Sequence, residues 1–188
     1  MDARIAEAVR ALRRGAVIVY PTDTLLGLGA RAVDRRAVER LCRTKRRPGG
    51  MPISLAVSSI EELESLIELD PLGRRFVREH LPGPYTLLAR ATPWATGKLA
   101  PELIGHSRVI GVRVPDHRVA RELAREVGPI VSTSANRHGE PPCRTVEEAR
   151  RVFGSEVGAY LAARPLPSGR PSMIVDLRGA EPRKVARG

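Results

Sequence analysis

The chain has 188 residues and 42% of them are hydrophobic, so it is long enough for one packed core and too apolar for a wholly disordered protein. Arginine and lysine outnumber aspartate and glutamate by 32 to 21, and the net charge of +11 favours an anionic partner such as a nucleotide or nucleic acid. Aromatic residues make up only 3%, which argues against a platform that stacks the bases of single-stranded RNA.

The sequence offers no signal for a membrane or for a metal. No apolar run is long enough to span a bilayer, and the first residues lead into an amphipathic helix instead of a signal peptide. We therefore expect a cytoplasmic protein. Cys42 and Cys143 lie far apart without metal-ligand spacing, and we expect both to be free thiols.

A helix and a strand open the chain. Ile5, Val9 and Leu12 recur at helical spacing, which predicts an amphipathic helix over residues 3–13. The apolar, β-branched run at residues 16–20 predicts a buried strand.

A polar stretch follows this strand, from Thr22 to Gly29, with hydroxyls, one carboxylate and two glycines. A loop at the end of a core strand stands on a rigid base, which suits a binding loop, although the same composition also suits an ordinary turn. A second hydroxyl-rich loop favours binding. It begins with Thr133, directly after a predicted strand at residues 130–132, and reaches Asn136.

A cationic cluster lies between these two loops. Asp34 is a good N-cap for a helix that ends at Lys45-Arg46-Arg47, and the prolines and glycines at 48–52 forbid regular structure beyond it. Cations at a helix C-terminus favour the helix dipole, which is one explanation for them. The other is an anion-binding loop for phosphate or carboxylate.

The rest of the chain alternates predicted helices and strands. Capping residues and periodicity predict helices over residues 58–69, 70–80, 116–127 and 145–153. Apolar runs predict strands over residues 53–57, 85–91, 109–114, 157–161 and 172–177, and an edge strand within 181–188. Residues 92–107 are expected to form a loop. Without a linker or composition break, we expect one α/β domain over residues 1–188, with a mixed sheet flanked by helices.

The candidate site combines hydroxyls, an amide and cations. Arg113 falls inside an apolar strand, where we expect it to face a ligand or a carboxylate. The other candidates are Thr22, Thr24, Ser132, Ser134, Ser172, Asn136, Lys45 and Arg47. No Walker A loop, nucleophile elbow or dinucleotide fingerprint is present. The set suits positioning and charge neutralisation in a transfer at phosphorus.

Six motifs, in this order, resemble those of the YrdC-like family of threonylcarbamoyl-AMP synthases. They are Tyr20-Pro21-Thr22-Asp23-Thr24 with Gly27-Leu28-Gly29; Lys45-x-Arg47-Pro48 with Pro52; Leu81-Pro82-Gly83-Pro84-Tyr85-Thr86; Gly111-Val112-Arg113-Val114-Pro115; Ser132-Thr133-Ser134-Ala135-Asn136 with Gly139; and Pro171-Ser172 with Ile174-Val175-Asp176-Leu177. The resemblance covers residues 5–188 and fits the short, single-domain form.

The resemblance implies a twisted, open α/β sheet with a basic concave face, and a nucleotidyltransferase reaction. L-threonine and bicarbonate would combine as N-carboxythreonine, whose carboxylate attacks the α-phosphorus of ATP. The products would be threonylcarbamoyl-AMP and pyrophosphate, and a downstream transferase would pass the group to tRNA. Mg²⁺ would accompany ATP without a protein-made site, and a weak contact with tRNA is a further expectation.

The resemblance also implies a role for each matching residue. The catalytic residues would be Lys45 and Arg47. Threonine would be bound by Thr24, Arg113, Ser132 and Ser172. The nucleotide would be bound by Arg47, Met51, Ser134, Asn136, Cys143 and Arg187.

The chain departs from the family pattern at a few positions and leaves two other functions open. Leu26 stands where the family usually has Tyr or Phe, Met51 where it has Lys, Asn or His, Met173 where it has Thr, and Arg137-His138 where it has an aliphatic residue and Ser. One alternative is a non-catalytic RNA- or ribosome-binding module, which would need charge but not hydroxyls at strand ends. The other is a paralogue that forms a different carbamoyl adenylate.

Overall fold

The computed structural model describes residues 2–48, 53–104 and 108–186. Met51 and Arg187 of the predicted nucleotide set therefore lie outside the described residues. The helices are α1 Ala3–Arg13, α2 Arg35–Lys45, α3 Ile60–Leu66, α4 Pro71–His80, α5 Pro93–Lys98, α6 Arg118–Val127 and α7 Val146–Phe153, with 3₁₀ turns at Pro101–Leu103 and Gly154–Glu156. The strands are β1 Ile18–Pro21, β2 Leu26–Gly29, β3 Ser54–Ala56, β4 Tyr85–Arg90, β5 Val109–Arg113, β6 Ile130–Ser134, β7 Ala159–Tyr160, β8 Met173–Asp176 and β9 Arg183–Val185.

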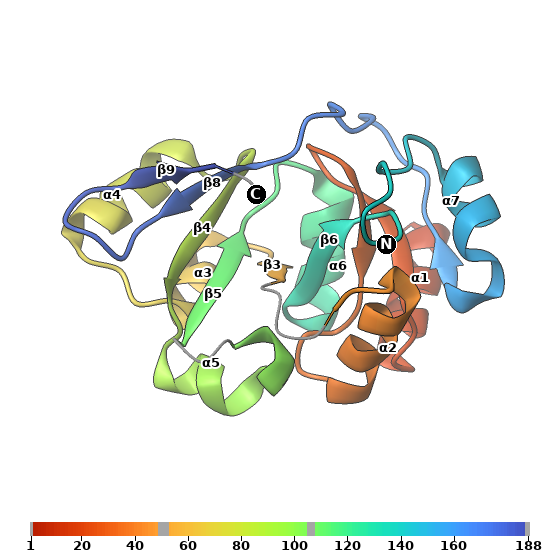
Figure 1. Cartoon of the computed structure of the whole chain (residues 1–188), viewed down its shortest axis with the longest axis horizontal. Coiled ribbons are helices and arrows are strands. Elements are labelled where there is room, and N and C mark those ends of the chain that lie inside the picture. The colour runs from red at the N-terminus through yellow and green to blue at the C-terminus, as the bar shows by residue number, and fades with distance from the viewer. Residues whose placement is uncertain (1, 49–52, 105–107, 187–188) are drawn as a thin grey trace.

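The strands form one open, mixed sheet in the order β7-β1-β2-β6-β3-β5-β4-β8-β9. The pairs β1–β7, β3–β5 and β4–β8 are parallel, and the other neighbours are antiparallel. The predicted mixed α/β sheet is therefore confirmed. In Figure 1, β9 and α4 lie at one end of the molecule and α7 lies at the other.

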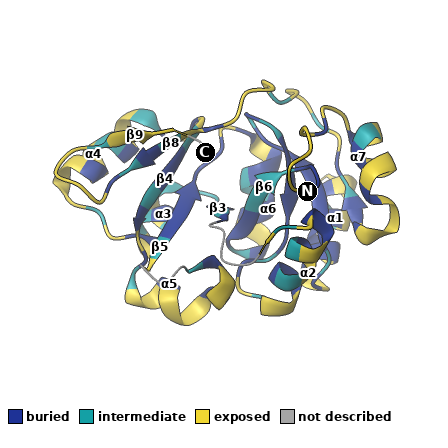
Figure 2. Cartoon of the chain, in the orientation of Figure 1, coloured by how far each residue is buried: buried dark blue, intermediate teal, exposed yellow. Residues whose placement is uncertain are grey.

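Helices cover both faces of the sheet, as the continuous apolar run of β1 requires. Ile18 and Tyr20 belong to a core cluster with α1 and α6, whereas Val17 and Val19 belong to the larger cluster on the opposite face. All four side chains are fully buried. Figure 2 shows the buried strands at the centre and the exposed residues on the outer surfaces of the helices.

Local capping explains why the predicted helices begin where they do. A side-chain oxygen at each N-cap accepts a hydrogen bond from a backbone N–H of the first turn, which satisfies a donor that the helix itself leaves unpaired. Asp34 is the N-cap that the sequence predicts, and Ser59, Asp70 and Thr145 are the N-caps of the helices predicted to start near residues 58, 70 and 145. The helix expected from Asp116 is an exception, because it begins at Arg118 with His117 at the N-cap.

Two segments predicted as loops are regular structure. The end of the first polar stretch is strand β2, which pairs with β1 on one side and β6 on the other. A Cβ at Gly29 would lie 2.7 Å from the ring of Tyr20, so this strand needs glycine there in spite of its weak strand propensity. The prediction of a loop over residues 92–107 is wrong at α5, which Thr92 caps and Pro93 begins.

Cys42 and Cys143 are free thiols, as predicted. Within the part of the chain that the structure describes, no helix has the length and apolar character needed to cross a bilayer.

Candidate active site

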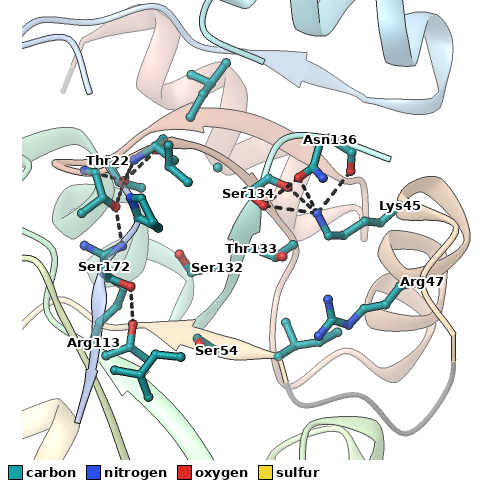
Figure 3. Close-up of a pocket in the computed structure, with 18 of the residues that line it drawn as sticks. Thr22, Lys45, Arg47, Ser54, Arg113, Ser132, Thr133, Ser134, Asn136 and Ser172 are labelled. Atoms are coloured by element: carbon teal, nitrogen blue, oxygen red, sulfur yellow. Dashed lines mark hydrogen bonds between the residues drawn. The ribbon is translucent and has the colours of Figure 1, made fainter. Parts of the chain in front are cut away.

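The polar strand ends meet in one pocket of about 520 Å³. It is lined from β2, β3, β4, β5, β6 and β8, and from the end of α2. Nine of the predicted site residues line it, namely Thr22, Thr24, Lys45, Arg47, Arg113, Ser132, Ser134, Asn136 and Ser172. Figure 3 shows Arg113 and Ser172 on one side of the pocket and Lys45, Arg47 and Asn136 on the other.

Arg113 is the central residue of the first end of the pocket, the side that also holds Ser172. Its side chain is 6% exposed and donates from Nη2 to Oδ1 of Asp23 at 2.5 Å and from Nη1 to Oγ1 of Thr24 at 2.8 Å. The prediction that this buried arginine faces a carboxylate is confirmed. Burial lowers the pKa of Arg113, and the negative charge of Asp23 opposes that effect, so Asp23 stabilises the charge of the buried guanidinium.

A tight hydroxyl-centred turn sets the position of Thr24. Oγ1 of Thr22 accepts from the backbone N–H groups of Thr24 and Leu25 and lies 3.0 Å from Oγ1 of Thr24. This is the local side-chain-to-backbone bonding that Thr favours in turns. These bonds hold the hydroxyl of Thr24 at the pocket wall, where it accepts from Arg113.

The wall next to Arg113 carries further hydroxyls. Oγ of Ser172 lies 2.8 Å from Oγ1 of Thr86, and both side chains are buried. Ser54 and Ser132 lie opposite each other in the register of β3 and β6, between the two ends of the pocket.

Lys45 is the central residue of the second end of the pocket, the side that also holds Arg47 and Asn136. It is the last residue of α2 and is 3% exposed. Its ammonium donates to the carbonyl oxygens of Ser134 and Asn136, at 2.7 and 3.2 Å, and to Oδ1 of Asn136 at 2.8 Å. These contacts use all three donors of the group. Lys45 therefore fastens the end of β6 to α2 and places a positive charge at the pocket wall.

Arg47 adds a second positive charge at this end. It follows Arg46, which adopts a left-handed conformation that ends α2 and turns the chain toward the pocket. Partial burial lowers the pKa of Arg47. Two cations near each other in a partly desolvated pocket are costly, so an anionic ligand would relieve the cost.

Burial, followed by repulsion from Arg47, lowers the pKa of Lys45 to about 8. The folded chain thus releases this proton near pH 8, while the unfolded chain holds it to about pH 10.5. Between these values the unfolded state binds more protons, so the contribution of Lys45 to the free energy of unfolding increases with pH. The increase is at most about 1.4 kcal/mol per pH unit.

We expect urea unfolding at pH 7.5, 8.5 and 9.5 to show this gain in the wild type relative to Lys45→Met. Parallel pH dependences of the two proteins would contradict it.

Four residues at the site are not singled out by the sequence patterns. Ser54, Thr86 and His138 line the pocket, and Asp23 pairs with Arg113. An arginine in an apolar strand requires a counter-charge, and this was the available signal for Asp23. Cys143 is buried and does not line the described pocket, so its predicted nucleotide contact remains a prediction.

Leu26 and Met173, which both depart from the family pattern, differ in whether they line the pocket. Leu26 lines the pocket, where it forms an apolar part of the wall, whereas Met173 is 39% exposed and does not line it. Within the described ranges, no group of three or more His, Cys, Asp or Glu could hold a metal ion.

A pocket with cations and hydroxyls at the ends of mixed strands is the architecture that the sequence motifs imply, and comparison with known proteins identifies the family. The family profile of Sua5, YciO and YrdC, described as telomere recombination, matches residues 10–188. The chain belongs to this family.

Individual relatives agree with this assignment. The threonylcarbamoyl-AMP synthase of Chromohalobacter salexigens is 40% identical over 187 residues, which cover 95% of this chain and 95% of that protein. The crystal structure of Escherichia coli YciO is similar with a TM-score of 0.85 and 29% identity, over 98% of this chain and 88% of that one. The crystal structure of P. abyssi Sua5 in complex with L-threonine gives a TM-score of 0.87 and 28% identity, over 96% of this chain. This chain spans 52% of the length of that Sua5 chain.

Proposed function

We propose that this protein synthesises L-threonylcarbamoyl-AMP from L-threonine, bicarbonate and ATP and releases pyrophosphate. The observation that carries the proposal is the pocket with two chemically different ends. One end has a buried arginine among hydroxyls, which suits a small hydroxy amino acid with a carboxylate. The other has Lys45 and Arg47, which suit phosphates. The name of the 40% identical relative and the threonine complex of Sua5 support the same reaction.

The first end is proposed to bind threonine. Arg113 supplies the positive charge for its carboxylate, and Thr24, Ser132 and Ser172 supply hydroxyl contacts. Because Asp23 already pairs with Arg113, the net charge at this end is low, which suits a substrate without net charge such as the threonine zwitterion.

The second end is proposed to bind ATP through Ser134, Asn136 and Arg47, with Met51, Cys143 and Arg187 as further predicted contacts. The threonine amine forms an N–C bond with the carbon of bicarbonate, and water leaves, to give a carbamate. A carbamate oxygen then forms a bond to the α-phosphorus as the bond from that phosphorus to pyrophosphate breaks. Lys45 and Arg47 neutralise negative charge that builds on the phosphate oxygens, an effect that is large in a partly dry pocket.

The proposed roles of Mg²⁺ and of a downstream transferase follow from the chemistry of this reaction. Mg²⁺ would arrive with ATP and neutralise its outer phosphates. The product is a reactive mixed anhydride, so a downstream transferase that delivers the group to tRNA must accept it. A weak tRNA contact stays a prediction, as does cytoplasmic localisation. The domain is proposed to extend over residues 1–188.

We expect the purified protein, with ATP, L-threonine, bicarbonate and Mg²⁺, to release pyrophosphate only when all the substrates are present. Mass spectrometry should detect threonylcarbamoyl-AMP in the same reactions. Release that requires carbamoyl phosphate instead of threonine would identify a different carbamoyl adenylate. Pyrophosphate no higher than in the ATP-only blank, from protein that still binds ATP, would refute the synthase.

A further inference from the structure

Arg137 joins the ends of two helices beside the pocket. It follows Asn136 in the loop from β6 to α7, and its side chain is 10% exposed. Nη1 donates to the carbonyl oxygen of Thr44 in the last turn of α2, and Nη2 donates to that of Val152 in the last turn of α7 at 3.1 Å. Carbonyls of a last turn lack helical partners and carry the negative end of the dipole, so one guanidinium stabilises both ends.

The charge of Arg137 and the flat face of its guanidinium also have partners. The carboxylate of Glu156 accepts from both Nη atoms, at 3.0 Å from Nη1 to Oε2 and in a shorter contact from Nη2 to Oε1. The guanidinium carbon lies 5.0 Å from the centroid of the Phe153 ring. The hydrogen bond from Arg137 lowers the pKa of Glu156, as expected for a paired carboxylate. Arg137 is therefore held in one orientation by four separate groups.

The contacts of this loop converge on Lys45. Thr44, the acceptor for Arg137, directly precedes Lys45, and the backbone N–H of His138 donates to the carbonyl oxygen of Lys45 at 2.7 Å. Nδ2 of Asn136 donates to the carbonyl oxygens of Arg137 and Glu140, at 2.7 Å each, which leaves its Oδ1 to accept from Lys45. The position of Lys45 thus depends on how the loop is fastened to α2.

We propose that Arg137 is a positioning residue, which clamps α2 to the loop from β6 to α7 and so holds Lys45 and Asn136 in the geometry that binds the substrate phosphates. The phosphate part of this inference rests on the proposed function. The clamp changes the surroundings of Lys45, so it can be tested without measuring enzyme activity.

The test is the titration of the Lys45 ammonium in two clamp variants. The chain has only three lysines, Lys45, Lys98 and Lys184, so ¹³Cε-labelled lysine gives three NMR signals, and Lys45→Arg assigns one of them. Arg137→Lys keeps the charge and loses the fork that reaches two carbonyls and a carboxylate at once. Glu156→Gln keeps Arg137 and removes its counter-charge from a residue whose side chain is 47% exposed, so this variant should fold.

Both variants should raise the pKa of Lys45 above about 8, because a loosened α2 lets water reach the ammonium. A charge effect alone gives another pattern: no shift for Arg137→Lys, and a decrease for Glu156→Gln, which adds net positive charge. The titratable groups around Lys45 are Arg47, Cys143 and the nearby His138, and both variants leave them in place. Shifts that follow the charge pattern, or no shift in either variant, overturn the clamp.

Kinetics extend the test to catalysis. Arg137→Lys should lower kcat about 10- to 100-fold, the effect of a small misplacement in a site, while KM for L-threonine stays unchanged. The matched control is Arg74→Ala, which removes an ion pair with Glu64 between two helices away from the pocket lining and should leave both values unchanged. An inactive wild type refutes the synthase without affecting the Lys45 titration. An unchanged kcat in Arg137→Lys overturns the positioning role.

Discussion

Arg47→Ala should lower the rate of threonine-dependent pyrophosphate release by about 100- to 1,000-fold with little change in the midpoint of urea unfolding. Loss of one charge-stabilising donor from a preorganised site has an effect of this size. Arg47 is only partly buried and lies beyond the end of α2, so we expect its side chain to contribute little to the stability of the fold. Initial rates over a range of ATP and threonine concentrations measure the effect.

The matched control for this variant is Arg43→Ala. Arg43 lies in the last turn of the same helix, is exposed and does not line the pocket, so its replacement removes the same net charge from the same region. We expect the control to stay within about twofold of the wild type, because an exposed charge is screened by solvent. Near-wild-type turnover of Arg47→Ala, or an equal loss in both variants, would contradict a catalytic role for Arg47.

Arg113→Ala should destabilise the protein by about 3–5 kcal/mol and abolish measurable threonine binding. The variant leaves the carboxylate of Asp23, whose side chain is only 12% exposed, without its partner, and an uncompensated buried charge has a cost of this order. Urea unfolding and isothermal titration with L-threonine measure the two effects. By comparison, Arg178→Ala breaks a more exposed pair with Asp176 and should cost under about 1 kcal/mol.

A double variant separates the two roles of Arg113. Asp23→Asn combined with Arg113→Met removes both charges, and replacement of a buried ion pair by neutral side chains is often close to neutral. The double variant should therefore regain most of the lost stability and still bind threonine at least about 10- to 100-fold more weakly, the worth of a charged hydrogen bond. Wild-type affinity for threonine in this folded variant would show that Arg113 is structural only.

The sequence by itself determined the elements whose signals are local. The caps at Asp34, Ser59, Asp70 and Thr145 each act on a backbone N–H three positions away, so they can be read in a short window of sequence. The β-branched run of β1 likewise specifies a buried strand without knowledge of its neighbours. The chemistry of the pocket, hydroxyls with cations, was also readable, because the residue types alone define it.

Only the tertiary structure decided how these groups pair. Asp23 and Arg113 lie 90 positions apart, and Lys45 and Ser134 lie 89 apart, so nothing in a local pattern selects one partner over another. The formation of strand β2 also depends on distant partners. Its glycines favour a loop, and pairing with β1 and β6 around the Tyr20 ring overrides that preference. In the sequence, Arg137 is only a departure from the family pattern in a loop. Its role follows from the fold, which places the carbonyls of Thr44 and Val152 beside it. Contacts of this kind depend on how the elements pack, because their free energy arises only when the whole sheet has brought distant strand ends together.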